Sequence, residues 1–510
     1  MRNRLASGQN LGSNSGSSEG ARKSISNNVK AVVLQVIFNG VLVFILYRYL
    51  YYKLGVEQIG IWSLVLATTS ISRFGDMGLS AGVVRFVAQA LGQNDGKRAA
   101  DIIQTVVLTI GVSMAVLLLA GYPLFTRALH YVMPARSLPV AVSILPYALA
   151  SLWSLLVVGV LSGGLDGCMR MDLRGLLMGG SSVVYLGFTV LLVPRMGLRG
   201  VALAQLIQTA GLAVIMWGVL RRQLPDLPWV PWRWQYRVIR QMFSYGANYQ
   251  VITFAGMLFD PVVKGLISRF AGLGALGYFE MANKLISQGR SIIVEATRVL
   301  VPAMAALQER DLDQATELFV RSHRLTFYVS AVFYGLLGVG LTVANLLWIG
   351  HAEVLFVQFG LLMNLGWYVN TIMKPAYFAN MGSGDLKSNV VSHLIVLFLT
   401  PILGAGLGFY FSGLGVAMGT AISLILGSLY VLVSYFHHAG LNWRKNLIPK
   451  GMTLLFLSSL GLPVLSNLGV GQSEGLARAA IFAGLGCLPL LVLAWVNPER
   501  SLLFRRGEPT

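Results

Sequence analysis

The chain contains about 14 apolar stretches that are each long enough to cross a lipid bilayer as a helix. They extend from near residue 29 to near residue 496 of its 510 residues. A membrane-spanning helix needs roughly 20 apolar residues, because the hydrocarbon core is about 30 Å thick and a helix rises about 1.5 Å per residue. With 55% apolar and 12% charged residues, the chain cannot bury this surface in one water-soluble core. We therefore expect an all-α polytopic membrane protein.

The expected spans are separated by short connections. Runs such as Val106 to Ala120 do not alternate apolar and polar residues, which excludes the strands of a membrane barrel. The expected limits are 29–53, 57–88, 102–126, 138–163, 174–194, 197–221, 242–270, 276–304, 322–348, 352–380, 388–410, 412–436, 450–468 and 476–496.

Basic residues lie mostly on one side of this topology. With the N-terminus placed inside, 26 of the 39 Lys and Arg residues fall in segments that face the cytoplasm. The positive-inside rule then places both termini in the cytoplasm. The formal charge of +19 is explained mainly by topology, and no nucleic-acid partner is expected, because a basic stripe with stacking aromatics on a soluble surface is missing.

Three pairs of segments repeat at a nearly constant offset in residue number. LGVEQIGIW, from residue 54, matches AGLGALGYF at an offset of 217; GQNDGKRAADII matches QERDLDQATELF at an offset of 216; and LRGVALAQLIQ matches GLGVAMGTAIS at an offset of 215. Together these matches cover six helices of each half. Because six is even, both halves enter the membrane from the same side, so they form a parallel repeat.

The repeat and the changes in composition divide the chain into six parts. We expect a disordered cytoplasmic tail at 1–27, an N-lobe at 28–221, a basic, Trp-rich cytoplasmic linker at 222–241, a C-lobe at 242–436, an appended pair of helices at 437–496 and a cytoplasmic tail at 497–510.

Ionisable side chains at membrane depth mark a candidate transport path, because each costs about 2.5–3.5 kcal/mol to insert. The eighth span carries Glu280, Lys284, Arg290, Glu295 and Arg298. All but Arg290 fall on one helical stripe, which predicts a cavity face. Internal pairing is the alternative, because Glu280 with Lys284 and Glu295 with Arg298 have helical spacing.

Arg290 has no acid one turn away, which leaves it free for a phosphate. Arg73 matches it at the offset of 217, so the two halves would present a pair of guanidinium groups, although Arg73 also fits an interfacial anchor. Asp260 precedes Pro261 in the seventh span, which favours a hinge or cation site, or a local pair with Lys264. Lys374 has no local acid, and it either faces the cavity or extends toward the cytoplasm.

Catalytic and metal-binding patterns are missing from the sequence. GLGALG at 272–277 lies in a short predicted loop, and GQNDGKR at 92–98 is too short for a P-loop and lacks its Ser or Thr. Cys168 and Cys487 are far apart and indicate neither a disulfide framework nor a zinc site. We expect no enzyme activity, catalytic residue, metal or cofactor, and leave coupling to H+ or Na+ open.

The segment LGVEQIGIWSLVLATTSISRFGDMGLSAGVVRFVAQALGQNDGKRA at 54–99, the repeated Gly-Val-Ala segments and the two-lobe spacing resemble bacterial polysaccharide or oligosaccharide flippases, such as O-antigen flippases, of the MOP superfamily, relatives of MATE exporters. The resemblance covers residues 28–436, and the last two helices are similar to the extra pair of 14-helix members. It implies two six-helix lobes around a cavity that opens alternately to either membrane face, and movement of undecaprenyl-diphosphate-linked sugars to the outer leaflet.

The resulting hypothesis is a flippase for O-antigen or exopolysaccharide repeat units in the bacterial inner membrane. A MATE-like cation-coupled multidrug exporter is the alternative, and a lipid II flippase or a membrane glycosyltransferase or ligase ranks lower. Expected partners are the lipid-linked oligosaccharide, membrane lipids and polysaccharide polymerase or ligase machinery. The expected substrate-binding residues are Arg290, Arg73, Arg298, Lys284 and Lys374, and the expected coupling or gating residues are Asp260, Glu280 and Glu295.

Overall fold

The computed structural model describes residues 37–70, 79–240, 250–308, 311–468 and 475–501. These residues form α-helices with short connections, and none of them lies in a β-strand. Six of the described helices are long and apolar enough to cross a membrane, and a bent pair makes a seventh. The expected all-α polytopic fold is confirmed, whereas the number of 14 spans stays a prediction.

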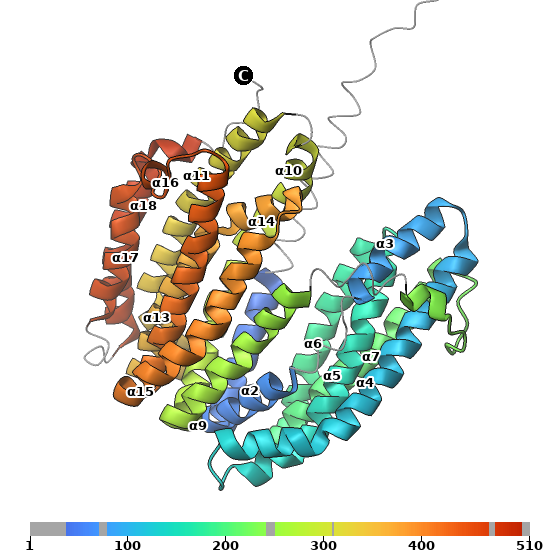
Figure 1. Cartoon of the computed structure of the whole chain (residues 1–510). Helices are drawn as coiled ribbons and strands as arrows, with labels where there is room; N and C mark the ends of the chain where they lie inside the picture. The colour runs from blue at the N-terminus through green and yellow to red at the C-terminus, as the bar shows by residue number, and fades with distance from the viewer. Residues whose placement is uncertain (1–36, 71–78, 241–249, 309–310, 469–474, 502–510) are drawn as a thin grey trace, which may run out of the picture.

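The helices of the N-terminal half form one bundle (Figure 1). Helix α5 lies at its centre and packs against α3, α4 and α7, because its apolar residues surround the helix and are buried on several sides. The elements are an unlabelled helix at 37–54, α2 (Val56–Ser70), α3 (Leu79–Gly92), α4 (Gly96–Val132), α5 (Leu138–Gly167), α6 (Met171–Met196) and α7 (Leu198–Gln223).

The C-terminal half forms a second bundle around α9, which packs against α13 and α15. Its elements are α9 (Gln250–Thr297), α10 (Leu300–Gln308), α11 (Leu312–Val339), α12 (Leu341–Ile349), α13 (Val354–Ile372), α14 (Lys374–Ser383), α15 (Lys387–His438), α16 (Trp443–Asn446), α17 (Thr453–Asn467), α18 (Leu476–Val496) and the short 3-10 helix η4 (Pro498–Arg500). The residue limits proposed for the two lobes stay predictions.

Several expected spans have a different form in the structure. Helices α9 and α15 each run through two expected spans, with non-helical backbone at Gly272 and Ser412. The expected span at 322–348 instead bends by 48° between α11 and α12. The span at 352–380 breaks between α13 and α14, because Pro375 at the start of α14 has no N–H to continue the ladder.

The bends occur at matching positions of the repeat. Gly55 and Gly272, which match at the offset of 217, have φ of +83° and +82°. Gly197 and Ser412, which match at the offset of 215, have φ of +56° and +55°. Positive φ is accessible to glycine at little cost, and Ser412 adopts it with its hydroxyl donating to the Phe270 carbonyl at 2.7 Å. Each half therefore turns in the same way at the same two places.

A second pair of matched glycines brings helices into backbone contact within each half. A Cβ added at Gly200 would lie 2.7 Å from the carbonyl carbon of Leu192, and one added at Gly415 would overlap the carbonyl group of Leu407. The two glycines match at the offset of 215, and so do the two leucines. Small residues permit such close approach between membrane helices, so the repeated Gly-Val-Ala segments are packing elements.

The last two long helices, α17 and α18, pack on α11 of the C-terminal bundle. The Tyr328 hydroxyl donates to the carbonyl of Ala494 at 2.9 Å, and the hydroxyls of Tyr368 and Ser459 lie 3.0 Å apart. Arg324 forms an ion pair with the buried Glu499 just beyond α18. These polar contacts fix the appended pair to the bundle.

Replacing Asn467 with alanine should lower the stability of this attachment. The Asn467 amide oxygen accepts hydrogen bonds from the backbone N–H and the hydroxyl of Thr342, and its amide nitrogen donates to the Gly338 carbonyl at 2.9 Å. Leaving these buried groups without a partner should cost about 1–3 kcal/mol. Thermal unfolding in detergent measures the effect. The matched control is Asn446→Ala, which removes only an exposed bond to Asn442, and an equal loss in both variants would contradict the prediction.

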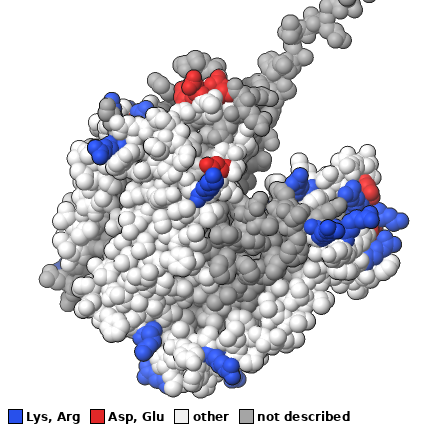
Figure 2. Space-filling model, viewed as in Figure 1, with Lys and Arg blue, Asp and Glu red and all other residues white. Residues whose placement is uncertain are grey.

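On the face that Figure 2 shows, charged residues gather toward two ends of the molecule, with a largely uncharged band between them. At one end of the N-terminal bundle, Arg233 lies 3.4 Å from Asp101, and Arg170 donates to Gln223 at 3.3 Å. The structure thus brings together segments that the positive-inside rule assigns to the cytoplasm.

Candidate functional site

The two bundles meet where α2 crosses α9 (Figure 1). A Cβ added at Gly60 would overlap the carbonyl oxygen of Leu273, and a Cβ added at Gly277 would overlap the carbonyl oxygen of Val56. Backbone therefore lies directly on backbone at this crossing. The bundles diverge toward α3 and α10 (Figure 1).

The crossing follows the internal repeat. Val56 matches Leu273 at the offset of 217, and Gly60 matches Gly277 at the same offset. The same contact is therefore made twice, once in each direction, around a pseudo-two-fold axis between α2 and α9. The glycines that identified the repeat in the sequence close one face of the molecule.

A buried carboxylate lies one turn further along this interface. Glu280 is 4% exposed, and its oxygens lie 2.8 Å from Lys264 Nζ and 3.9 Å from Lys284 Nζ. It also accepts hydrogen bonds from the N-terminal half, at 2.8 Å from the Ser63 hydroxyl and 3.2 Å from the Tyr47 hydroxyl. This interlobe cluster of Glu280, Lys264, Ser63 and Tyr47 joins the two bundles through one anion.

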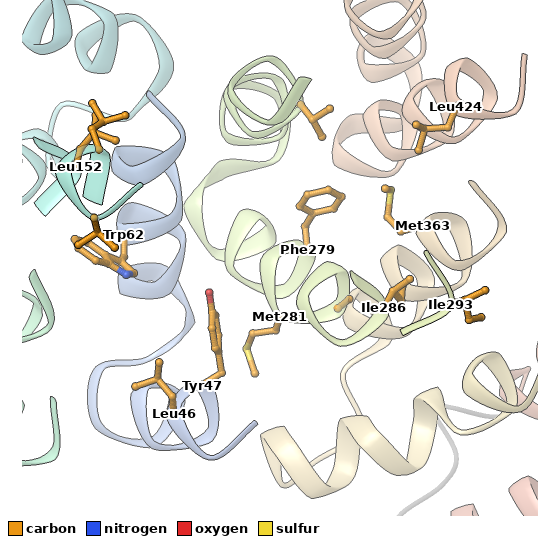
Figure 3. Close-up of a cluster of buried hydrophobic side chains, with 14 of the residues drawn as sticks. Leu46, Tyr47, Trp62, Leu152, Phe279, Met281, Ile286, Ile293, Met363 and Leu424 are labelled. Carbon is orange, nitrogen blue, oxygen red and sulfur yellow. The ribbon is translucent and has the colours of Figure 1, made fainter. Parts of the chain in front are cut away.

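The interlobe cluster also obeys the repeat. Ser63 matches Glu280, and Tyr47 matches Lys264, each at an offset of 217. In Figure 3 the Tyr47 hydroxyl points into the space between α2 and α9, while Trp62 on α2 points away, toward Leu152. The sequence reasoning missed Tyr47 and Ser63, although the offset from Glu280 and Lys264 would have located them.

The other predicted coupling residues lie in more open surroundings. Asp260 is 3.9 Å from Lys264, with its side chain 56% exposed. Glu295 and Arg298 pair at 3.5 Å, and both side chains are about half exposed. The stripe expected along the eighth span thus passes from a buried ion cluster at Glu280 to an open pair near the end of α9. Arg73 lies outside the described residues.

Arg290 is held in the C-terminal bundle by neutral groups. Its guanidinium donates to the Asn370 amide oxygen at 2.9 Å and lies 4.4 Å from the ring centre of Trp367. Its Nε is buried without a hydrogen-bond partner. Asn370 is fixed in turn by Ser428, at 3.1 Å. No acidic side chain pairs with Arg290 in the part of the chain that the structure describes.

A second cation, Lys374, lies within electrostatic range of Arg290. It begins α14 and is 9% exposed, so its side chain is enclosed rather than extended into water. Its ammonium lies 4.5 Å from the ring centre of Tyr377, and that ring contacts His393 at 5.9 Å. Lys374 makes no ion pair with any described residue. Sequence patterns did not indicate Trp367 and Asn370, which lie on α13, or His393, which lies on α15.

An apolar groove of about 330 Å³ lies beside this region. The helix at 37–54, α9 and α11 form it, with exposed Ile37 and Val41 on one side and Phe333 on the other. A Cβ at Gly289 would overlap the Phe333 ring, so the glycine lets α9 approach α11. Lys284 is the cation in its lining, with its side chain 42% exposed.

The chain is similar in sequence to a known protein family and in fold to solved membrane transporters. Residues 25–308 match the family model described as polysaccharide biosynthesis protein. The fold is similar to that of the lipid II flippase MurJ in an inward closed conformation, with a TM-score of 0.72, 13% identity and coverage of 93% of this chain and 98% of that one.

Two further solved structures share the fold. An inward-facing multidrug resistance MATE transporter of the MOP superfamily has a TM-score of 0.67 at 12% identity, with 80% of this chain and 94% of that one covered. A MOP superfamily transporter from Pyrococcus furiosus, described as having a binding pocket of reverse polarity, has a TM-score of 0.60 at 11% identity, with 81% and 95% covered. No curated protein matches the chain in sequence.

Proposed function

Because the chain belongs to the polysaccharide biosynthesis protein family and has the fold of MOP superfamily transporters, we propose that it is a flippase for undecaprenyl-diphosphate-linked oligosaccharide. Its cargo is an O-antigen or exopolysaccharide repeat unit, which it moves across the bacterial inner membrane by alternating access. Both termini lie in the cytoplasm in this proposal.

The observation that carries the proposal is the pair of cations at Arg290 and Lys374. Both lie in the C-terminal bundle without an acidic partner among the described residues, with Lys374 buried and Arg290 partly buried. An unpaired charge at membrane depth is costly, so such residues usually face a cavity or a ligand. A diphosphate carries the charge and the acceptor oxygens that two such cations need. A cationic drug would be repelled by them.

The apolar groove supports a substrate with a lipid tail. Its lining includes Ile37 and Val41, which are exposed apolar residues of the helix at 37–54. Lys284 also lines the groove and places a positive charge beside these apolar walls. A polyisoprenoid chain fits such walls through the burial of apolar surface. In the proposed complex, the tail occupies the groove while the head reaches the cations.

The arrangement of the bundles fits one state of an alternating-access cycle. The crossing of α2 and α9 closes one face, and the two bundles diverge at the other (Figure 1), where the segments that the positive-inside rule assigns to the cytoplasm gather. We therefore assign this structure to an inward-facing state, in which the head group enters from the cytoplasm.

Replacing either Arg290 or Lys374 should strongly reduce transport. Proteoliposomes carrying the wild type, Arg290→Ala or Lys374→Met should be assayed for flipping of a fluorescent undecaprenyl-diphosphate oligosaccharide. Loss of one charge-assisted contact, worth about 1.5–3 kcal/mol, should slow flipping about tenfold or more. Arg290→Lys should keep part of the activity, because it retains the charge but not the forked donor geometry.

The matched control is Arg136→Ala, which also removes a positive charge, but from an exposed pair with Glu57. It should change flipping by less than about twofold. Equal activity in all folded variants would remove Arg290 and Lys374 from the substrate site. No flipping by the wild type, together with uptake of cationic dyes under an ion gradient, would instead support the multidrug-exporter function.

A further inference from the structure

The segment that follows α7 folds back along the outside of α4. The backbone N–H groups of Trp232 and Arg233 lie 3.4 Å from the Gln104 side-chain oxygen, and the Trp234 indole donates to the Thr109 hydroxyl at 3.0 Å. The helix between Gln104 and Thr109 covers about 7.5 Å along its axis. The segment thus descends from the charged end of α4 toward its apolar middle.

The outer surface of this segment is aromatic and basic. Trp229, Trp232, Trp234 and Tyr236 are 74%, 67%, 54% and 65% exposed. Residues 221–240 contain five arginines and one acid, Asp226. Large aromatic side chains with polar edges are favoured at the level of lipid head groups, whereas four of them exposed to water would be unfavourable. Their exposure indicates that lipid surrounds them.

A groove lies beside this surface, at the end of α7, with a volume of about 620 Å³. Its floor is one face of α7, and its walls come from the turn that follows. Ile215, Gly218 and Val219 form the apolar part, and Arg221, Arg222 and Trp229 line the charged end. Gly218 has open space where a side chain would lie.

The two arginines of the groove differ in how they are held. The guanidinium of Arg221 stacks on Trp229 at 3.8 Å from the ring centre, and its Nε donates to the Leu227 carbonyl at 2.8 Å. Arg222 is exposed and forms no ion pair with any described residue. The first arginine is positioned by the fold, and the second is available to an anion.

We propose that this groove binds an anionic phospholipid of the cytoplasmic leaflet, with the phosphate at Arg222 and Arg221 and an acyl chain along Ile215 and Gly218. The apolar floor beside the cations selects a lipid over a free phosphate or an acidic protein, neither of which would cover it. The bound lipid holds the start of the linker, and with it the N-terminal bundle, at the membrane surface.

Native mass spectrometry of the full chain in detergent tests the proposal. Dioleoylphosphatidylglycerol and dioleoylphosphatidylcholine are titrated against the wild type, Arg222→Gln and Arg195→Gln. The wild type should retain phosphatidylglycerol preferentially, and Arg222→Gln should weaken its binding about fivefold, as expected for one interfacial basic residue. Arg195 is the matched control, because it lines a different groove together with apolar residues. That groove lies at the C-terminal end of α6.

Equal binding of the two lipids by the wild type would overturn the proposal. This comparison uses the wild type alone, so it does not require that a variant folds. An equal loss in Arg195→Gln would also overturn it, because net charge alone would then explain the preference. Displacement of phosphatidylglycerol by millimolar inorganic phosphate would exclude a role for the apolar floor. Tight binding of polyglutamate without a lipid preference would assign the surface to an acidic protein.

Discussion

Replacing Gly60 with valine should open the face that the α2 and α9 crossing closes and should stop transport. A side chain at this position overlaps the Leu273 carbonyl, which is backbone and cannot rotate away. Overpacking of this kind costs about 1–3 kcal/mol. The population of the closed arrangement, relative to arrangements in which this face is open, should therefore fall about 5- to 150-fold.

The distance between spin labels on the two bundles measures this shift. Val140 and Tyr410 are exposed and lie near the crossing, since Ser137 bonds to Glu57 of α2 and Ser412 to Phe270 of α9. The control is Gly274→Ala, because its added Cβ would lie at an ordinary 4.0 Å from Val56. An unchanged label distance in Gly60→Val would show that the crossing does not hold the face closed.

Replacing Glu280 with glutamine should destabilise the protein more than any other single charge removal discussed above. The change removes the carboxylate 2.8 Å from the ammonium of Lys264, which is 7% exposed, and leaves it only the largely exposed Asp260 at 3.9 Å. Breaking a buried ion pair by removing one partner typically costs about 3–5 kcal/mol. Thermal and denaturant unfolding in detergent should report the loss.

A double variant distinguishes the charge from the packing. Replacing both ions by apolar residues of similar size, as in Lys264→Met with Glu280→Leu, removes the unpaired charge and should restore most of the stability. Glu295→Gln is the matched control, since its pair with Arg298 is exposed and worth about 0–1 kcal/mol. Wild-type stability in Glu280→Gln alone would contradict the role assigned to the interlobe cluster.

Much of the architecture was predictable, because membrane crossing imposes length and apolarity on each span. The expected limits 174–194 and 476–496 correspond to α6, at Met171–Met196, and α18, at Leu476–Val496. The repeat was also visible in the sequence, since glycines that permit close packing and positive φ occur at matching positions in the two halves. Gly55 and Gly272 illustrate this, with nearly the same φ.

The environment of the charged residues was not predictable from spacing. Helical periodicity placed Glu280 and Glu295 on one stripe. It does not predict which part of that stripe a partner helix covers and which part stays open. Glu280 is covered by α2 and the helix at 37–54, whereas Glu295 is not. The partners of Arg290 were missed for a related reason, because Trp367 and Asn370 lie on a helix that is distant in sequence.

The interlobe cluster also depends on a difference between the two halves. In a dimer of two identical six-helix proteins, a residue beside the two-fold axis meets its own copy. A glutamate at the position of Glu280 would then face a second glutamate at the position of Ser63, and two carboxylates this close would repel each other. Two identical halves could therefore not hold an ionised glutamate in this contact. Because the two halves of this chain differ in sequence, one carries a hydroxyl at this position and the other an anion. An exchange of the two halves by circular permutation would preserve this contact, whereas a duplicate of either half alone would lose it.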